Sequence, residues 1–461
     1  MAKEGLTIDS IISLAKRRGF VFPSSEIYGG IAGIYDYGPI GAELAHTVKS
    51  AWWRQMVAER SDIVGLNSAI VMNPKVWVAS GHTSGFSDPL VECKKCHMRS
   101  RADHLLEQAG VEADEKMSEE EIGAIFREHK EHMTCPNCGV KDFTDVRLFN
   151  LLVTSNIGNF TGEKKDDVYL RGETAQGIYV NYKNVLDSMN VKIPFGIAQI
   201  GKAFRNEITP RQFLLRTREF EQMEMQYFTV PEKDMEEFEK LRNYRMNALL
   251  SMGLKKENLR WKKHENLVFY AKEAYDIEYN YPSYGWRELE GIHARGNYDL
   301  SQHEKHSGVD LKYFDEERKE KFIPHIAESS IGVGRLVLAL VSDAYDEEDV
   351  RGEMRTVLRF NKHIAPIKIA ILPLSKKEEL CRGAMGVFNT LKKEYMCQYD
   401  ETQSIGKRYR RQDEIGTPYC ITYDFESVND FAVTIRERDS MEQARVKIDE
   451  LREYFKEAYT S

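Results

Sequence analysis

Arginines, a carboxylate and an aromatic ring gather in two short segments of the chain, Phe204–Glu207 (FRNE) and Arg216–Phe220 (RTREF). Strand-like apolar segments flank the loop between them, which predicts an antiparallel hairpin. Arg205 and Glu207 are two positions apart at the end of the first strand, so we expect both side chains on one face. Guanidinium groups bind phosphate and carboxylate oxygens, and an aromatic face stacks on a base. Such a hairpin can hold a nucleoside triphosphate without a glycine-rich loop, although composition alone fits a solvated hairpin with surface ion pairs equally well.

Two CxxC pairs form a second candidate site, made of Cys93, Cys96, Cys135 and Cys138. In a protein without secretory features such pairs indicate metal ligands before disulfides. Four thiolates suit a closed, structural Zn²⁺ site. The alternatives are a reduced pair of knuckles without metal and a redox CxxC, and the second is disfavoured because two pairs flank one inserted helix. A zinc-dependent oxidoreductase or hydrolase would need an open metal position, which four cysteines do not favour.

The elements that position the hairpin alternate strands with turns and contain few βαβ spacings, which predicts an antiparallel sheet with flanking helices. A helix is expected around Leu44–Met56, and Ser118 with Glu121 forms a capping box for a polar surface helix that runs to His132. A buried helix is expected from about Gly334. The expected strands are Ser68–Met72, Ile197–Phe204, Met223–Val230 and Glu288–His293.

After Pro366 the pattern becomes more regularly α/β, which indicates a separate module. Within it, basic residues cluster around Tyr409 and offer a platform for phosphates and bases, or else a solvated amphipathic turn. These basic residues are Lys407, Arg408, Arg410 and Arg411. The expected elements of the module are a strand at Lys368–Leu372, a helix at Lys376–Tyr395, strands at Tyr419–Tyr423 and Phe431–Ile435, and a closing helix at Ser440–Ala458.

The composition is that of an ordinary globular protein, with 461 residues, 42% hydrophobic residues and a net charge of −8. The best apolar stretch, Ile331–Val341, is too short to span a membrane and carries Arg335. Basic residues follow the first apolar stripe rather than precede it, so no signal peptide is expected and a cytoplasmic location is the simplest interpretation. Net charge neither supports nor excludes an RNA partner, because local patches set phosphate contacts.

The hairpin resembles motif 2 of class II aminoacyl-tRNA synthetases, and Gly332–Arg335 at the start of the apolar helix resembles motif 3. Pro39, with the helix that contains Trp52, resembles motif 1, which forms the dimer interface in that class. The resemblance covers nearly the whole chain and narrows to the dimeric type of glycyl-tRNA synthetase. The strings that carry it, besides motif 2, are Tyr35–Pro39, Arg101–His104, Arg171–Gln176, Arg408–Gly416 and Thr434–Asp439.

The resemblance implies an α+β catalytic domain with an antiparallel sheet, the class II synthetase fold, and a C-terminal α/β anticodon-binding domain. It implies ATP-dependent attachment of glycine to tRNA(Gly) through a glycyl adenylate, with Mg²⁺, in a homodimer. The expected segments are the first catalytic part with motif 1 (1–92), the insertion with the CxxC pairs (93–147), the second catalytic part with motifs 2 and 3 (148–360) and the anticodon-binding domain (365–461).

The resemblance also implies roles for single residues, with Arg205 and Arg335 as the catalytic pair. Arg295 is a further contact on the ATP side, and Arg101 lies near the adenylate or the acceptor stem. The implied ATP-binding residues are Arg205, Asn206, Glu207, Arg216, Phe220, Glu288, Leu289 and Arg335. The implied glycine-binding residues are Glu173, Glu224, Glu328, Ser330 and Arg101.

Glycine offers no side chain, so its recognition depends on the ammonium and carboxylate groups. Three carboxylates satisfy a small cation in a dry pocket and leave no room for a β-carbon. No natural amino acid is smaller, so an editing domain is unnecessary. A synthetase-like protein that no longer charges tRNA, such as a polymerase accessory subunit or a regulatory RNA binder, is the main alternative. It would be expected to lose the ATP-binding residues that this chain retains.

Overall fold

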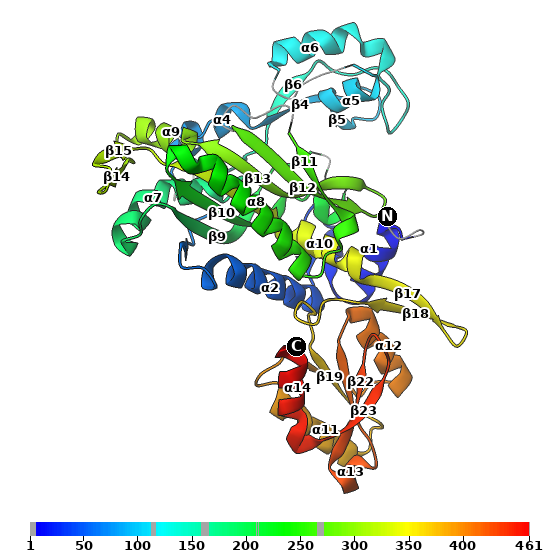
Figure 1. Ribbon diagram of the computed structural model, residues 1–461. Coiled ribbons are helices and arrows are strands. Elements are labelled where there is room, and N and C mark those ends of the chain that lie inside the picture. The colour runs from blue at the N-terminus through cyan, green and yellow to red at the C-terminus, as the bar shows by residue number, and fades with distance from the viewer. Residues whose placement is uncertain are drawn as a thin grey trace.

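The computed structural model contains a central body, an insertion and a C-terminal module (Figure 1). Within the described part of the chain, no helix is both long and apolar enough to cross a membrane. The structure describes residues 6–111, 117–157, 166–208, 210, 212–264 and 272–460.

The body is built on a seven-stranded sheet. Neighbouring strands are antiparallel except at one edge, where the short strand β3 runs parallel to β9. This arrangement confirms the antiparallel sheet expected from the sequence, and three of the four expected strands lie in it. In spatial order the strands are β11 (Leu259–Lys263), β12 (Glu273–Tyr281), β13 (Gly285–Gly296), β16 (His325–Gly332), β10 (Glu219–Thr229), β9 (Phe195–Phe204) and β3 (Ile63–Gly65).

The fourth expected strand, Ser68–Met72, is wrong. This segment forms only an isolated bridge between Val71 and Leu170. Its backbone is instead fixed by side chains, because Gln199 Oε1 accepts from the Ser68 amide at 2.8 Å and Arg171 donates to the Ser68 carbonyl at 3.0 Å. These partners come from distant segments, so periodicity within the segment does not reveal them.

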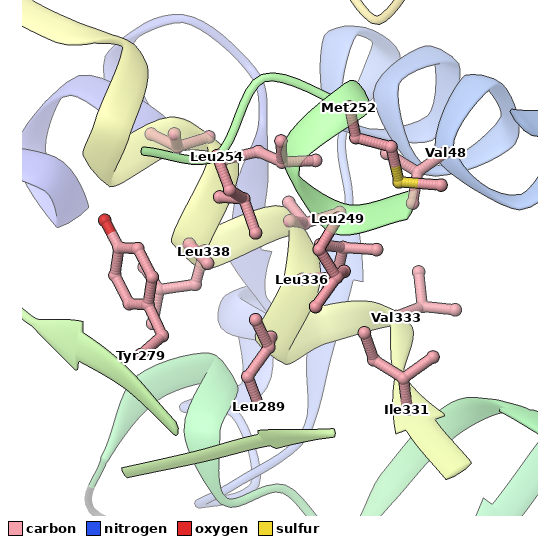
Figure 2. Packing of buried hydrophobic residues seen from close by; sticks show 14 of the residues in the cluster. Val48, Leu249, Met252, Leu254, Tyr279, Leu289, Ile331, Val333, Leu336 and Leu338 are labelled. Atoms are coloured by element: carbon pink, nitrogen blue, oxygen red, sulfur yellow. The ribbon is translucent and has the colours of Figure 1, made fainter. Parts of the chain in front are cut away.

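One face of the sheet packs on helices α2 (Pro39–Trp53), α8 (Asp234–Ser251) and α10 (Val333–Ala344). Helix α10 is apolar on nearly all sides and is therefore buried, as expected from its sequence. It packs against β10 and β16 of the sheet and against α2, whereas α8 contacts β13 and β16 directly (Figure 2). The residues labelled around it are Val48, Leu249, Met252, Leu254, Tyr279, Leu289, Ile331, Val333, Leu336 and Leu338.

The opposite face of the sheet is divided between apolar and polar residues. Helices α7 (Ala175–Met189) and α9 (Tyr298–Ser307) cover one part of it with a smaller apolar cluster that includes Tyr182 and Phe228. Along β10 the next residues on this face are Gln226, Glu224 and Gln222, all buried. Side chains alternate along a strand, so this polar row continues the apolar one toward the hairpin.

The insertion stands apart from the body in Figure 1. Its three-stranded sheet begins at Ser87 and ends at Asn150, outside the expected limits of 93 and 147. The capping box of Ser118 and Glu121 is present, as expected. The helix ends at Glu128 and a 3-10 turn continues to His132, and the helix buries one apolar stripe although its other face is polar. Its elements are β4 (Ser87–Glu92), β5 (Arg99–Arg101), α5 (Ala102–Gln108), α6 (Glu119–Glu128) and β6 (Arg147–Asn150).

The C-terminal module has a mixed sheet with helices on both faces. Ile371 and Ile421 face α11 and α14, whereas Ala370 and Cys420 face α12. In spatial order the strands are β20 (Cys397–Tyr399), β19 (Ile369–Pro373), β21 (Tyr419–Tyr423), β22 (Ala432–Glu437) and β23 (Gln443–Lys447). The helices named are α11 (Glu378–Leu391), α12 (Ile405–Ile415) and α14 (Leu451–Thr460).

The closing helix expected over Ser440–Ala458 is wrong in its first half. Residues Gln443–Lys447 form β23, which pairs antiparallel with β22, and the helix starts at Leu451. The apolar spacing that predicted one helix crosses a strand and a turn, because Leu451 and Phe455 are buried in the core whereas Ala444 is exposed at the sheet edge. Pairing with a distant strand overrides the local period here.

Candidate active site

The expected hairpin is present as strands β9 and β10, joined antiparallel with Phe204 opposite Glu219. Strand β9 ends at Phe204, so strand alternation does not orient Arg205 and Glu207 as predicted. The buried Glu207 carboxylate accepts a hydrogen bond from Arg216 Nε at 2.6 Å. The Glu207 carbonyl accepts another from Arg218 Nε at 2.7 Å. These bonds tie the two arms of the hairpin together beyond the end of the strand pairing.

The Arg205 guanidinium lies between two aromatic rings. It is 5.2 Å from the centroid of Phe86 and 5.4 Å from that of Phe220. Its Nε donates to the Gly172 carbonyl at 3.1 Å, which anchors it to the segment before α7. The neighbouring Asn206 amide donates to Leu151 at 2.8 Å, so the backbone here is held from the side of the insertion. Arginine and Phe220 therefore meet as the sequence predicted.

Arg335 and Glu288 form an ion pair at the start of α10. Arg335 Nη1 is 2.9 Å from Glu288 Oε2, and its Nε donates to the Leu215 carbonyl at 3.2 Å. The positive charge of Arg335 is the main cause that lowers the pKa of Glu288 to about 2. About half of the Glu288 side chain and a third of the Arg335 side chain are exposed, at 48% and 32%. A charged pair thus faces solvent beside the hairpin loop.

A β-bulge at Leu289 gives Glu288 its orientation. In the pairing of β12 with β13, Ile277 lies opposite Glu290, and the next residue, Glu278, lies opposite Glu288. Leu289 is therefore the extra residue of the bulge. The Leu289 side chain is buried in the core, so only its backbone remains for the ATP contact implied by the resemblance (Figure 2). Without the extra residue, Glu288 would share the helix-covered face with Glu290, since side chains two apart lie on one face.

Glu224 lies on β10 directly opposite Ser330 of β16, and both side chains meet at the polar end of the sheet. The carboxyl group accepts from Thr174 Oγ1 at 2.6 Å, Ser330 Oγ at 2.7 Å and Gln222 Nε2 at 3.0 Å. Burial is the main cause that raises its pKa to about 8, and the charges of Glu328 and Glu173 add to the effect. Glu224 is therefore mainly protonated at neutral pH.

Glu328 stands two residues before Ser330 and opposite Gln226. It accepts from Gln226 Nε2 at 2.8 Å and Arg295 Nη1 at 2.9 Å, and His293 Nδ1 lies at 2.9 Å. Burial alone would raise its pKa, but the charge of Arg295 and the contact with His293 lower it to about 2. One buried carboxylate thus stays ionised beside the neutral Glu224.

Glu173 closes the pocket from the segment that precedes α7. Gln176 Nε2 donates to it at 2.9 Å, and His82 Nε2 lies 3.5 Å from the same oxygen. Burial acts to raise the Glu173 pKa, but His82 and then Arg295 bring it below the usual range. The three glutamates shift one another's pKa values, so the predicted glycine residues Glu173, Glu224 and Glu328 do come together.

Two of the predicted contact arginines, Arg295 and Arg101, pair with carboxylates around the site. Arg295 is buried behind the glutamates, where its Nε donates to Asp299 at 2.9 Å. It belongs to the carboxylate pocket rather than to the pair of Arg335 and Glu288. Arg101 lies beside the motif 2 loop, because its Nη1 donates to Asp88 at 2.9 Å and Asp88 lies 3.7 Å from Arg216 Nη2. Arg101 thus connects the insertion with the hairpin.

Sequence reasoning missed several residues that build the pocket. The signal for Gln222 and Gln226 was present, because they lie two residues before and after Glu224 and are separated from it by Met223 and Met225, so all three polar side chains share one face. Thr174 lies inside a quoted string but gave no separate signal. Phe86 and Asp88 could not be found, since they come from a segment near the insertion that meets the hairpin only in three dimensions.

The four cysteines of the CxxC pairs converge in the insertion, as expected. Their sulfur atoms all lie within 4.8 Å of one another. The shortest separations are 3.6 Å, for Cys93 with Cys138 and for Cys96 with Cys135. Four tetrahedral ligands at the usual Zn–S distance of about 2.3 Å stand roughly 3.8 Å apart, so the thiols fit a zinc ion. Hydrogen bonds from the side chain of Asn137 and the Met98 backbone lower the pKa of Cys96, whereas desolvation and the neighbouring thiols raise the pKa of Cys138, so the four sulfur atoms interact closely.

The predicted tRNA-binding residues all lie on α12, but Arg408 is a correction. Its guanidinium is buried and donates to the carbonyls of Leu374 and Asp400, both at 3.3 Å, and of Pro373. It closes the carboxyl end of β19 and is not available to a phosphate. Tyr409 is also packed inside, with its hydroxyl 2.6 Å from Thr422 Oγ1, and is not an exposed platform.

The other three residues differ in exposure. Arg411 is bound to Asp400, with its Nε donating at 3.0 Å, and Arg410 pairs with Glu353. Lys407 is exposed. Glu353 belongs to the hairpin of β17 (Tyr345–Val350) and β18 (Glu353–Leu358), on which α12 packs. Helix α12 is therefore part of the joint between the body and the C-terminal module (Figure 1).

Asp413 is the charged centre of this joint. Arg355 Nε of β18 donates to it at 2.8 Å and Arg436 Nη1 of β22 donates at 3.0 Å. All three side chains are at most 10% exposed. The strings Arg408–Gly416 and Thr434–Asp439, which carried the family resemblance, thus serve packing between domains to a large degree.

Comparisons with solved structures show the fold. The chain superimposes on prolyl-tRNA synthetase of Cryptosporidium parvum, complexed with L-proline and AMP, with a TM-score of 0.62 and 15% identity. The match covers 99% of this chain and 76% of that one. Prolyl-tRNA synthetase of Giardia lamblia, in complex with prolyl-adenylate, gives a TM-score of 0.63 at 14% identity, over 96% of this chain and 74% of that one.

Comparisons with protein families and curated proteins show to which family the chain belongs. The class II tRNA synthetase core domain (G, H, P, S and T) matches residues 159–344, and the anticodon binding domain matches residues 368–458. Glycine–tRNA ligase of Acetivibrio thermocellus is 54% identical over 457 residues, which cover 97% of this chain and 98% of the relative. Glycine–tRNA ligase of Bacillus cereus is 50% identical over 453 residues, with the same coverage of 97% and 98%. The chain belongs to the glycine–tRNA ligase family of class II aminoacyl-tRNA synthetases.

Proposed function

We propose that this chain attaches glycine to tRNA(Gly) through a glycyl adenylate, at the cost of ATP. The observation that carries the proposal is the pocket of three glutamates, the buried Glu224 and Glu328 and the partly buried Glu173, beside the arginine of motif 2. The carboxylate of glycine attacks the α-phosphorus of ATP and pyrophosphate leaves. The terminal ribose hydroxyl of tRNA then attacks the adenylate, and AMP leaves.

The pocket supports recognition of glycine by its ammonium group. Glu328 and Glu173 are held ionised by Arg295 and His82, and both face the neutral Glu224. An ammonium between them gains charged acceptors in a dry site. Every polar partner around Glu224 is already close, so a β-carbon would have to displace a packed side chain, which costs roughly 1–3 kcal/mol.

The hairpin supports ATP binding. In this proposal Arg205 contacts the α-phosphate and the glycine carboxylate. Phe220 stacks on adenine, and the base then takes the place of the Arg205 guanidinium at the face of the Phe220 ring. Arg216 and Arg335 bind the terminal phosphates. Each now pairs with a carboxylate, at 2.6 Å and 2.9 Å, so ATP phosphates would replace these partners. Catalysis is then positioning and charge stabilisation, without a protein nucleophile.

The remaining ATP contacts follow the resemblance. Glu207, freed from Arg216, would face the adenine amino group, and Asn206 and the Leu289 backbone complete the set. Glu288 is the proposed ligand on the Mg²⁺ side, because an exposed, ionised carboxylate is a hard oxygen donor. The ion would neutralise phosphate charge there. The four-cysteine site is proposed to hold a structural Zn²⁺, since all four ligand positions are thiols.

The larger organisation follows the family. The chain divides into a catalytic body, an insertion and an anticodon-binding module (365–461), and the insertion expected at 93–147 extends to 87–150 once β4 and β6 are included. Among the basic residues of α12, Lys407 is the one best placed for a tRNA phosphate, as it is exposed. A homodimer through motif 1 and a cytoplasmic location are further parts of the proposal. Sedimentation and cell fractionation test them.

The main test is ATP–pyrophosphate exchange with glycine, alanine or serine as the amino acid. We expect exchange with glycine, little with alanine or serine, and a loss of at least a hundredfold in Arg205→Ala. Lys202→Ala is the matched control, because Lys202 lies three residues before Arg205, on β9, and its 45% exposed side chain pairs with Glu219 at the surface. Folded wild type that gives no exchange with any amino acid would favour an RNA-binding protein that has lost charging activity.

A further inference from the structure

Three side chains, of which only His293 has been described so far, as a contact of Glu328, converge on the polar face of the sheet. They are His264 just after β11, Asp276 of β12 and His293 of β13. One donor atom from each lies within 4.8 Å of the other two. Two imidazoles and a carboxylate at this spacing are a ligand set for a divalent cation.

His293 is oriented as a metal ligand would be. Its Nδ1 lies 2.9 Å from Glu328 Oε1, so the ring position is fixed from behind. Ligating histidines usually have such a carboxylate on their other nitrogen, which fixes the tautomer and the ring. The free nitrogen, Nε2, is then directed at the side where Asp276 lies.

A glycine keeps the space between these two residues open. Gly291 stands directly opposite Asp276 in the pairing of β12 with β13. A Cβ built on Gly291 would lie 3.3 Å from His293 Nε2 and 3.8 Å from Asp276 Oδ1. Any other residue at this position would therefore enter the gap between the two donor atoms.

His264 completes the set from the edge of the sheet. Its Nε2 is 2.8 Å from Asp276 Oδ2, yet within the described part of the chain this buried nitrogen makes no hydrogen bond of acceptable geometry. The rings of His264 and His293 are 5.9 Å apart and nearly perpendicular, at 78°. A close approach without a hydrogen-bond direction is what two ligands of one ion show.

We propose that His264, Asp276 and His293 form a second divalent-cation site, of the Zn²⁺ class, on the sheet between the glutamate pocket and Glu288. The donor set favours Zn²⁺ over Mg²⁺ or Ca²⁺, because those ions require oxygen ligands and this site offers two imidazole nitrogens. Three protein ligands leave one coordination position open. The site is separate from the four cysteines, which lie in the insertion rather than on this sheet.

A bound ion would also affect the glutamate pocket. This consequence rests on the proposed function, because it concerns glycine binding. A metal on His293 Nε2 fixes the proton on Nδ1, so Nδ1 becomes a permanent donor to Glu328. Glu328 is thereby held in one orientation toward the ammonium group of glycine. His293 acts in this scheme as a positioning residue, not as a contact of the substrate.

The test is zinc content of the full chain, measured by plasma mass spectrometry after dialysis against buffered free Zn²⁺ at neutral pH. We expect His264→Gln, Asp276→Asn and Gly291→Ala each to bind one zinc fewer per chain than wild type. Gly291→Ala is the sharpest variant, because it leaves all three ligands and only fills the gap. His306→Gln, an exposed histidine of α9, is the matched control and should keep the wild-type content.

Near-ultraviolet circular dichroism shows which variants are folded. If Gly291→Ala is not folded, Asp276→Asn serves as the deciding variant. The chain can also be loaded with Co²⁺. Subtracting the spectrum of a Co²⁺-loaded variant from that of Co²⁺-loaded wild type should leave visible d–d bands but no thiolate charge-transfer band. Equal zinc content in wild type and in folded Asp276→Asn would overturn the proposal. Glycine-dependent pyrophosphate exchange is measured in the same wild-type sample, so failure of the metal site and failure of the proposed reaction are distinguishable.

Discussion

Glycine binding should release a proton, because Glu224 is neutral in the empty pocket and must ionise against an ammonium group. Burial, with the charges of Glu328 and Glu173, raises the pKa of Glu224 to about 8. At pH 7, one unit below, about nine in ten molecules carry the proton. A cation in contact lowers a carboxyl pKa by about 1–3 units, and a shift near the upper end releases about 0.9 proton per site.

The sign and size of the pH dependence follow from this value. Above pH 8 the free carboxyl is already ionised, so titration of Glu224 no longer makes glycine affinity depend on pH. Below pH 8 ionisation costs free energy, so affinity falls as pH falls, by about tenfold from the plateau to pH 7 and about tenfold more to pH 6. The tenfold step equals about 1.4 kcal/mol. His82 and His293 lie near the other two glutamates, so the Glu224 contribution must be isolated by mutation.

Calorimetry of wild type and a Glu224 variant isolates the proton that Glu224 releases when glycine binds. Glycine is titrated at pH 7 in phosphate and in Tris, whose ionisation enthalpies differ, and the difference in observed heat gives the protons released. Glu224→Gln should release close to none and bind glycine more weakly. Glu219→Gln, at the exposed start of the same strand, should behave as wild type. Equal heats in both buffers, together with a glycine KM that is unchanged from pH 8 to pH 7, would refute the reasoning.

Three further predictions concern the joint, the insertion and the C-terminal module. Asp413→Ala should reduce the free energy of unfolding by about 3–5 kcal/mol, because it removes the buried carboxylate that Arg355 and Arg436 share, although Arg355 keeps Glu348, and an unchanged urea midpoint would contradict this. Removing zinc with a chelator should make the insertion, but not the sheet of the body, sensitive to limited proteolysis, because four thiols then lose their common ligand. Lys407→Ala should reduce the slope of log tRNA affinity against log salt by about one, whereas loss of affinity without a change of slope would argue against a phosphate contact.

Much of the fold could be predicted because its strongest signals are local. Helix α10 is apolar on nearly all sides, and β9 and β10 are long strands bounded by turns, so length and composition were enough. The two wrong elements have non-local causes. Ser68 is held by Gln199 and Arg171, and Gln443–Lys447 pairs with β22, so neither conformation is encoded in the period of its own segment.

The candidate site divides in the same way. The motif strings were enough to single out Arg205, Phe220 and Arg335, because residue type and spacing carry that information. The position of Glu288 depends on the bulge at Leu289, which no spacing rule indicates. Arg408 illustrates the reverse case, since a basic cluster in the sequence became a buried donor to carbonyl groups in the structure.

The amino-acid sequence by itself determined the class of protein, the hairpin that can bind ATP, the glutamates that can bind an ammonium group and the four cysteines. These are statements about which chemical groups are present, and in what order. The tertiary structure alone decided which carboxyl is protonated, which arginines are free for a substrate, and that His264, Asp276 and His293 meet beside Gly291. Charge state and availability depend on burial and on neighbours from distant segments, and only folding brings those neighbours together.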